Sequence, residues 1–380
     1  MQYLDNDAVY QLLINLTKDE AIEFRKLIEK TFEDFSISGE RLYQPDPSAI
    51  TRPNGQRTLF RPFTSDSSVG AKLIVEPPLR PDGKKDPLHG ILILMNGQGH
   101  LTGILDAEEV TGYRTSMNAM VPFAWRTNVE YIVIFGAGMQ ALWHTRLILT
   151  LRGSEVKTIT FANPSRDRVD ALIETVSREN VARWKSDCSF RFIDTSALDS
   201  QEQIKTLLSA TDCVFCTTPS RKPLFPASYL TERRNNGRLP FISAVGSWQS
   251  DMIELDPKLL HHIIAADGGY NPISGEDTGV VLVDDRDYAL QNSGEAVQSK
   301  LKAENMVELG QILALMNWKI GFVNDQQIKL TQWFISQGFV VYKSIGVSLT
   351  DLTVSNAILA LAQKQQHHLQ CTNDRVDHIQ

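Results

Sequence analysis

The sequence predicts an α/β protein built on a doubly wound parallel sheet, and three observations favour this fold class. From Tyr131 onward, short apolar segments of strand length alternate with amphipathic segments of helix length, as repeated βαβ units require. The first of these strands leads directly into a glycine-rich turn, GAGMQA, and then into a helix. The sequence before Tyr131 has a helical start followed by several strands, so a second region of different architecture precedes the parallel sheet.

Length and composition limit the classes of protein that remain. A chain of 380 residues with 42% hydrophobic residues has material for two or three domains with their own cores. The formal charge of −7 provides no basic surface for nucleic acid or an anionic membrane, so we expect a small-molecule partner or a second copy of the chain. Four cysteines are too few for a disulfide framework, and the first ten residues do not resemble a secretory signal. We expect a soluble, cytoplasmic protein, since no apolar run approaches the roughly 20 residues that cross a bilayer.

Helices are expected at both ends of the chain. Asp7 and Thr17 are candidate N-caps of two opening helices, and Glu20 completes a capping box with Thr17. Near the other end, Thr350 is expected to cap a helix that runs through Ala362, followed by a polar tail.

Strands and one further helix are expected between these ends. Residues 56–76 and 90–95 have the composition of strands, and an exposed loop, PPLRPDGKKDPLHG, separates them. Residues 110–124 are expected to form a helix, and residues 339–346 a late strand. The strands of the parallel array are predicted at YIVIF (131–135), VKTITFA (156–162), FRFID (190–194), TDCVFCTT (211–218), FISAVG (241–246) and HHIIAAD (261–267).

The strongest chemical signal is the turn that follows the strand 131–135. Its GxGxxA spacing has a first glycine for the tight turn, a second that lets a pyrophosphate approach the backbone, and Ala141 for close packing of helix on strand. The N–H groups at the start of that helix would then face the phosphates. A plain glycine turn is the alternative, but the strand before it and the helix after it favour a dinucleotide and a Rossmann-type sheet. The turn residues that we expect to contact the cofactor are Gly136, Ala137, Gly138, Met139 and Gln140.

The end of the next strand indicates which dinucleotide is bound. An NAD site places an acidic residue there to bind the ribose 2′-hydroxyl, whereas this sequence has Asn163, then Ser165 and Arg166. A hydroxyl and a guanidinium can bind a 2′-phosphate that a carboxylate would repel. We therefore predict NADP(H), with NAD(H) as the alternative if Arg166 and Arg168 are simply a solvated first helical turn.

Other chemistries have little support. Cys213 and Cys216 have CxxC spacing, but they lie in an apolar strand and no second cysteine pair or flanking histidine completes a zinc set. The histidines form no HExxH motif, so no metal site is predicted. The sequence also has no GxSxG elbow and no P-loop, which leaves hydrolase and kinase functions unsupported.

A redox enzyme of this type needs charges that hold its substrate, and the front part of the chain offers Arg57, Lys72 and Arg114. Arginine presents a planar fork that matches a carboxylate, and a partly buried lysine can have its pKa lowered into a proton-donating range. From the residues alone, each of the three is better explained as a surface charge.

Six sequence blocks, in this order and spacing, resemble the ornithine cyclodeaminase and mu-crystallin family over about residues 55–360. These blocks are GAKLIVEPP, GHLTGILDAEEVTGYRTSMNAM, VIFGAGMQALWH, FISAVGSWQSDMIELD, VVLVDDRDYALQNSGE and VVYKSIGVSLTD. The resemblance implies an NAD(P)-dependent homodimer that forms or reduces carbon–nitrogen double bonds in amino acids. It also implies a discontinuous α+β domain for substrate binding and dimerisation, residues 1–116 and 350–380, around a Rossmann-type nucleotide domain, residues 117–349.

The same resemblance assigns roles to individual residues. Arg57 and Arg114 would be the two arginines that clamp the substrate carboxylate, although the match around Arg57 is loose, and Lys72 would be the lysine beside the substrate. Thr115 would contact the cofactor phosphates. The residues that would line the nicotinamide are Thr217, Thr218, Val245 and Ser344.

Departures from the family pattern bear on the reaction and the substrate. Cyclodeaminases carry an aspartate two residues after an AVG triplet, where this sequence has Trp248, so amine-attack chemistry loses its base. Asp251 follows three residues later, as in mu-crystallin-like sequences, and Met117 and Asn118 alter an RTAA segment that contributes to the pocket. We therefore expect reduction of a carboxylate-bearing imine. The alternatives are an amino-acid dehydrogenase, a cyclodeaminase and a non-catalytic NADPH-binding protein.

Overall fold

The computed structural model describes the chain except for residues 84–85, 233–237, 247–248, 266–268, 320–323 and 378–380. The described chain separates into two compact units. Unit 1 consists of Met1–Thr31, Gly39–Arg114 and Ser348–Gln380, and unit 2 consists of Phe32–Ser38 and Thr115–Val347. Unit 1 is therefore assembled from stretches that lie far apart in the sequence.

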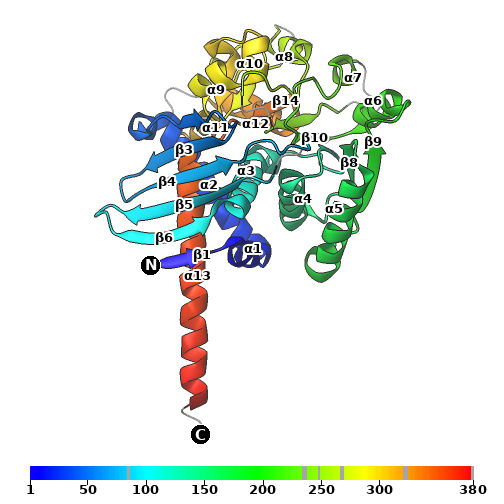
Figure 1. The fold of residues 1–380 in the computed structure, drawn as a ribbon. Helices are drawn as coiled ribbons and strands as arrows, with labels where there is room; N and C mark the ends of the chain where they lie inside the picture. The colour runs from blue at the N-terminus through cyan, green and yellow to red at the C-terminus, as the bar shows by residue number, and fades with distance from the viewer. Residues whose placement is uncertain (84–85, 233–237, 247–248, 266–268, 320–323, 378–380) are drawn as a thin grey trace. The chain divides into compact units, whose positions relative to one another are not determined.

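A mixed β-sheet forms the centre of unit 1 (Figure 1). Within the described residues its strand order is β1-β6-β5-β4-β3-β2, with β1 parallel to β6 and the other neighbours antiparallel. Residues 56–76, expected to be strands, form the hairpin of β3 and β4, whereas β1, β2 and β6 were not predicted. The strand bounds are β1 Gln2–Leu4, β2 Ser48–Thr51, β3 Arg57–Thr64, β4 Ser68–Glu76, β5 His89–Asn96 and β6 Leu101–Asp106.

The helices of unit 1 are α1 (Asn6–Ile14), α2 (Lys18–Ile37, whose last turns belong to unit 2) and α13 (Ser348–Asp377), with a short 3₁₀ turn at Glu40–Tyr43. The N-cap of helix α1 is Asp5, not Asp7, because the Asp5 carboxylate accepts a hydrogen bond from the Ala8 N–H. The capping box of Thr17 and Glu20 at the start of α2 is confirmed. Helix α13 packs on β3, β4 and β5, and it begins earlier and runs further than the sequence predicted.

Unit 2 contains the predicted doubly wound sheet, and its fold class is confirmed. Among the described residues, the strand order is β13-β12-β14-β11-β10-β7-β8-β9 and every neighbouring pair is parallel. The order reverses between β7 and β10, which is where such sheets bind ligands. The strands are β7 Tyr131–Phe135, β8 Thr158–Asn163, β9 Ser189–Asp194, β10 Cys213–Cys216, β11 Phe241–Ala244, β12 Val281–Val283, β13 Met306–Glu308 and β14 Val340–Lys343.

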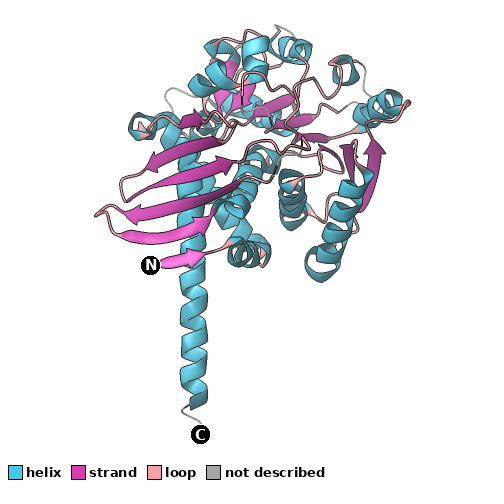
Figure 2. Cartoon of the chain, in the orientation of Figure 1, coloured by secondary structure: helices cyan, strands magenta, loops and turns pink. Residues whose placement is uncertain are grey.

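Helices surround this parallel sheet (Figure 2), and the strands supply its apolar core. Helix α3 (Ala107–Ala124) passes from unit 1 into unit 2 and confirms the helix expected there. None of the helices in the described part of the chain is long and apolar enough to cross a membrane. The helices that belong wholly to unit 2 are α4 Met139–Arg152, α5 Arg166–Glu179, α6 Ser200–Ala210, α7 Ser228–Thr231, α8 Pro257–Ile264, α9 Arg286–Asn292, α10 Gly294–Gln298, α11 Leu309–Met316 and α12 Asp325–Gln337.

One predicted strand is wrong. The segment HHIIAAD (261–267) overlaps helix α8 at residues 261–264, and its residues 266–267 lie outside the described residues. Among the described residues, the next parallel strand is β12. Asp256 caps α8 by accepting from the Lys258 N–H at 3.0 Å, and Pro257 occupies its first turn, where a missing N–H costs nothing. The buried residues Leu259, Leu260 and Ile263 follow helical spacing, so the apolar run was a helix face read as a strand.

Candidate functional site

The glycine turn of unit 2 has the geometry that a dinucleotide needs. Gly136 has φ +119°, and a Cβ added there would lie 2.5 Å from Thr217 Oγ1, so a side chain at this position would be strained and obstructed. Gly138 is the N-cap of α4, and an added Cβ would meet nothing within 4 Å. Gly138 and Met139 are exposed, so the start of α4 lies open to a ligand. Backbone N–H groups at such a helix start favour phosphate.

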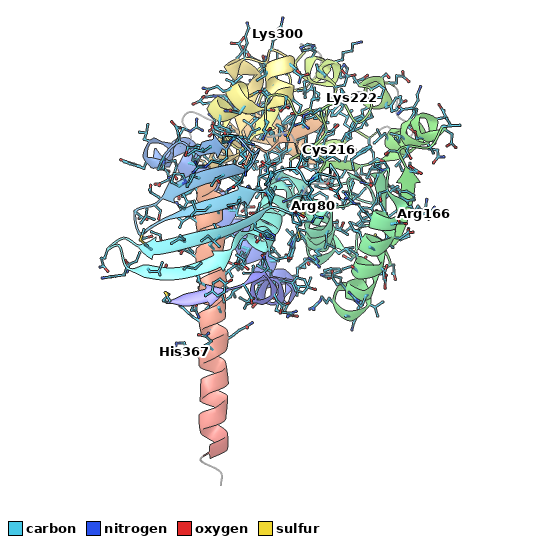
Figure 3. The ribbon with its side chains drawn as sticks, viewed as in Figure 1. Arg80, Arg166, Cys216, Lys222, Lys300 and His367 are labelled. Carbon is cyan, nitrogen blue, oxygen red and sulfur yellow. The ribbon has the colours of Figure 1, made fainter. Side chains whose placement is uncertain are left out.

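The residues expected at the adenosine ribose lie at one edge of this sheet. Asn163 ends β8, and its side-chain oxygen accepts from the Ser165 N–H at 2.9 Å. Arg166 begins α5 and is largely exposed (Figure 3). Its guanidinium carbon lies 5.0 Å from the centre of the Phe192 ring. Asp194 pairs with Asn163 across β8 and β9, so this edge does carry a carboxylate, one strand further out than an NAD site requires.

The residues expected at the nicotinamide follow three strands, β10, β11 and β14. The Thr217 N–H and hydroxyl both donate to the Phe135 carbonyl, at 2.9 and 2.8 Å. Val245 is half-buried just beyond β11. Ser344 follows β14 and donates its hydroxyl to Asp284 at 2.8 Å, and Asp284 also accepts from the Gly346 N–H at 2.7 Å.

Glu254, which the sequence analysis did not select, holds two of these loops together. Its Oε1 accepts from the Thr218 N–H at 2.6 Å and from the Thr218 hydroxyl at 3.1 Å, while its Oε2 accepts from the Gly246 N–H at 2.8 Å. The side chain is fully buried, and burial raises its pKa to about 7. Nothing in the local sequence indicates this role, because Thr218 lies 36 residues away.

Unit 1 contains a buried cluster of charges centred on Asp351 of α13. Lys72 Nζ donates to Asp351 Oδ1 at 2.9 Å, and Arg114 Nε donates to the same oxygen at 3.0 Å. The Thr111 hydroxyl lies 3.4 Å from Lys72 Nζ. Lys72, Arg114 and Asp351 are almost completely buried, so the structure brings two of the three predicted substrate residues together with an acid that was not predicted.

The third predicted residue, Arg57, stands apart from this cluster. Arg61 lies directly opposite Lys72 in the register of β3 and β4, and its charge acts on Lys72 and on Asp351. Arg57 lies four residues before Arg61 in β3, so its side chain is on the same face of the sheet. Arg57 Nη1 forms an ion pair with Glu76 Oε2 at 3.8 Å. Arg61, rather than Arg57, therefore lies beside Lys72 in the sheet.

Burial and neighbouring charges shift the pKa values of both Lys72 and Asp351. Burial lowers the pKa of Lys72 to about 7; Asp351 opposes this shift, and Arg114 and Arg61 add to it. Burial alone would raise the pKa of Asp351, but Arg114, Lys72 and Arg61 together hold it below its ordinary value.

Two buried polar atoms of the cluster, one a donor and one an acceptor, are available to a ligand. Arg114 Nη1 and Asp351 Oδ2 are buried and have no hydrogen-bond partner among the described residues. A buried polar atom without a partner costs about 1–3 kcal/mol, so a ligand that satisfies it is favoured. In the described part of the cluster, the cations Arg61, Lys72 and Arg114 outnumber the carboxylate of Asp351, which favours an anion.

The remaining predicted site residues are less informative. Thr115 and Met117 are buried in α3, and the neighbouring Ser116 hydroxyl lies 2.9 Å from His144 Nδ1. Asp251 is more than half exposed and pairs with Arg221 at 2.8 Å. Trp248 lies outside the described residues.

The two cysteines with CxxC spacing, Cys213 and Cys216, were not expected to bind a metal. Both cysteines are fully buried and form no disulfide, and burial raises the pKa of Cys213 to about 12 (Figure 3 labels Cys216). The described residues contain no cluster of His, Cys, Asp or Glu that could hold a metal ion.

Comparison with known proteins gives two relatives and no matching family model. The uncharacterized protein YGL159W of Saccharomyces cerevisiae is 21% identical and covers 95% of this chain and 97% of its own length. An uncharacterized cyclodeaminase of Dictyostelium discoideum is 26% identical over 79% of this chain and 77% of its own length.

Solved structures are similar along nearly the whole chain. The Thermococcus litoralis Δ1-pyrroline-2-carboxylate reductase, in complex with NADH and L-proline, has a TM-score of 0.70 at 16% identity and covers 96% of this chain and 98% of its own. The protein has the fold of the imine reductases and ornithine cyclodeaminases. The resemblance found in the sequence motifs is thereby confirmed at the level of the fold.

Two further structures support the same fold. An archaeal alanine dehydrogenase dimer with bound NAD has a TM-score of 0.67 at 17% identity, with 96% of each chain covered. A probable ornithine cyclodeaminase of Bordetella pertussis has a TM-score of 0.66 at 20% identity, with 97% of this chain and 98% of that chain covered.

Proposed function

We propose that the protein is an NADPH-dependent enzyme that reduces a C=N bond in a carboxylate-bearing imine. Its substrate is a cyclic imino acid or a ketimine, or the imine formed from a keto acid and an amine. The observation that carries this proposal is the buried cluster of Lys72, Arg114 and Asp351, which joins a titrating lysine to an unsatisfied arginine. The same chain contains a turn built for a dinucleotide.

The carboxylate of the substrate is bound by arginine in this mechanism. Arg114 offers Nη1, and Arg61 adds a second cation beside Lys72, so the two can hold a carboxylate in a defined orientation. Arg57, the other candidate from the sequence, is engaged with Glu76 and takes an outer position. A carboxylate held in this way also fixes the position of the neighbouring C=N carbon. The imine is then oriented for reaction before the chemical step begins.

Lys72 supplies the proton. A lysine with a pKa of about 7 can hold a proton at neutral pH and give it to the imine nitrogen, whose reduction is faster as the iminium. A reduced nicotinamide, when bound, would supply the hydride to that carbon, so that the C=N bond would become a CH–NH bond. Asp351 keeps the lysine ammonium in place through the 2.9 Å hydrogen bond.

NADP(H) is the proposed cofactor because Asn163 replaces the acid that binds the ribose 2′-hydroxyl in NAD sites. Arg166 is the candidate partner of the 2′-phosphate, since its guanidinium is largely exposed at the same edge. NAD(H) remains the alternative, and Asp194 on the adjacent strand is the feature that favours it.

A cyclodeaminase is the second candidate function, and the Dictyostelium relative favours it. Such a reaction would reduce and then re-oxidise NAD within one turnover, release ammonia and need an acidic residue that acts on the amine. The presence of Trp248 where that aspartate is expected disfavours it. A purely ligand-binding role is disfavoured by the proton-donating environment of Lys72.

Two parallel assays test the proposal. Purified protein should oxidise NADPH in the presence of Δ1-pyrroline-2-carboxylate or Δ1-piperideine-2-carboxylate, or of a keto acid with an amine. Ornithine with NAD should release no ammonia. The variant Lys72→Ala should lose turnover and keep NADPH binding. Ammonia release without net NADPH consumption would establish the cyclodeaminase, and cofactor binding without turnover on the whole panel would establish the binder.

A homodimer is proposed through the face of the unit 1 sheet that lies opposite α13. This face carries exposed apolar side chains at Tyr3, Ile50, Phe60 and Val75. Clustered exposed apolar residues mark association surfaces, and the alanine dehydrogenase of similar fold is a dimer. Val75→Lys should give a monomer in sedimentation velocity where the wild type is a dimer, while Val181→Lys, an exposed site on unit 2, should not.

A cytoplasmic location is proposed from the cysteines. Cys188, Cys213 and Cys216 are buried and unpaired, which suits a reducing compartment. Fractionation of cells that express the tagged protein tests this assignment.

A further inference from the structure

Glu254 connects the ends of two neighbouring parallel strands with a single carboxylate. One oxygen accepts from Thr218 after β10 and the other from Gly246 after β11, with all three hydrogen bonds between 2.6 and 3.1 Å. The backbone itself is in close contact here, because a Cβ at Gly246 would lie 1.9 Å from the Thr218 carbonyl oxygen. A movement of either loop is therefore transmitted to the other.

These two loops belong to the half of the sheet that receives the nicotinamide. In a doubly wound sheet, the strands on one side of the switch point bind the adenosine half and those on the other side bind the second nucleotide. Here β7, β8 and β9 form the first half, and β10, β11 and β14 the second. Glu254 makes its hydrogen bonds only within the second half among the described residues.

We propose that Glu254 is a positioning residue whose ionised carboxylate shapes the nicotinamide-binding loops, so that affinity for the nicotinamide half of the cofactor depends on its charge. The inference rests on the proposed function in requiring a nicotinamide dinucleotide, but not on which substrate is reduced.

The ionised form is the one that fits the loops. Each oxygen faces a backbone N–H, so a proton on either oxygen would place a donor against a donor and break one connection. The charged or titratable groups around the carboxylate are Lys343 on β14, Glu295 on α10 and Cys216 on β10. Glu295 accepts from the Glu254 N–H at 2.7 Å, and its Oε2 lies 3.8 Å from Lys343 Nζ.

Burial raises the pKa of Glu254 to about 7, while Lys343 lowers it and Glu295 raises it. The carboxylate therefore changes charge near neutral pH, with the ionised, loop-holding form favoured above pH 7. Nicotinamide binding should weaken as the pH falls through this value.

The test compares each dinucleotide with the same molecule lacking nicotinamide. Dissociation constants are measured by titration calorimetry for NADPH against 2′-phospho-ADP-ribose, and for NADH against ADP-ribose. The ratio of the two constants isolates the nicotinamide contribution and cancels the titration of the 2′-phosphate. Glu254→Gln should weaken dinucleotide binding about 10-fold or more and leave the fragment within about twofold, because the glutamine NH₂ cannot accept a hydrogen bond.

Glu179→Gln is the matched control. Glu179 is also a buried carboxylate of unit 2, and it accepts two hydrogen bonds from Arg146, at 3.0 and 2.7 Å, away from the β10 and β11 loops. Its loss should reduce thermal stability without changing the ratio.

The wild-type pH profile keeps the inference testable if Glu254→Gln does not fold. The ratio should favour the dinucleotide several-fold more at pH 8.5 than at pH 6, and this dependence should vanish in Glu254→Gln. Equal weakening of both ligands, an unchanged ratio or a flat wild-type profile would overturn the positioning role alone. A wild type that binds neither dinucleotide would overturn the proposed cofactor, and this inference with it. Binding without imine reduction would overturn only the proposed reaction.

Discussion

Lys72 and Asp351 are joined by a 2.9 Å hydrogen bond, although 279 residues separate them in the sequence. Both side chains are almost completely removed from solvent, so the pair is held in a low-dielectric environment. The same Asp351 oxygen binds Arg114 Nε, which fixes the arginine fork beside the lysine. One carboxylate thus orients both the proposed proton donor and the proposed carboxylate ligand.

The activity should depend on pH through Lys72. Because its pKa is lowered to about 7, the lysine carries a proton below pH 7 and loses it above. The kcat for imine reduction should therefore fall as the pH rises through about 7, and the reverse oxidation of the amine should rise. Asp351 raises the lysine pKa, so Asp351→Asn should shift the falling limb to lower pH. Rate profiles from pH 5.5 to 9.5 measure this, and a shift to higher pH would contradict it.

Arg61 and Arg57 offer a matched pair of substitutions on one face of one strand. Arg61→Ala should raise the KM for the imino acid about 10- to 100-fold, since a hydrogen bond to a charged group contributes about 1.5–3 kcal/mol. Arg57→Ala should have a much smaller effect because its partner is Glu76. Steady-state kinetics on both variants show which arginine binds the substrate carboxylate. The reverse order of effects would restore Arg57 as the carboxylate ligand.

Two glycines of the nucleotide turn should respond differently to alanine. Gly136→Ala places a side chain at φ +119° and 2.5 Å from Thr217 Oγ1, so it should cost at least about 1–3 kcal/mol of stability as well as dinucleotide affinity. Gly138→Ala meets no protein atom within 4 Å and should lose affinity for the dinucleotide while melting normally. Thermal melts and titrations with NADPH separate the two effects. Normal dinucleotide affinity in both variants would argue against phosphate binding at this turn.

Arg166 should discriminate between the two cofactors. Arg166→Ala should weaken NADPH binding about 10-fold or more and leave NADH binding nearly unchanged, because only NADPH carries the 2′-phosphate. Arg168→Ala is the control, since Arg168 is exposed on the same first turn of α5. Fluorescence titration of the reduced cofactors measures both constants. Tighter binding of NADH than NADPH by the wild type would assign NAD(H) instead.

Much of the architecture could be predicted because it follows from local patterns. The parallel strands after Tyr131 are short apolar runs, and the GAGMQA turn has dinucleotide spacing between a strand and a helix. The error at α8 has the same origin. Its few apolar residues fit a strand as well as a helix, and only the Asp256–Pro257 start distinguishes them. Strands β2 and β6 were missed because they lack a strong apolar alternation.

The residues of the candidate site were likewise predictable only where they belong to local sequence patterns. Sequence alone determined the nucleotide turn, and the resemblance to a known family selected Lys72 and Arg114, because those residues lie in recognisable motifs. The tertiary structure decided that Arg61 stands beside Lys72, that Asp351 joins Lys72 to Arg114, and that Glu254 connects two loops. These relationships depend on burial and on partners that approach only when the chain folds. Burial and distant charges set a pKa and leave an atom unsatisfied, and neither is recorded in the spacing of residues along a strand or helix.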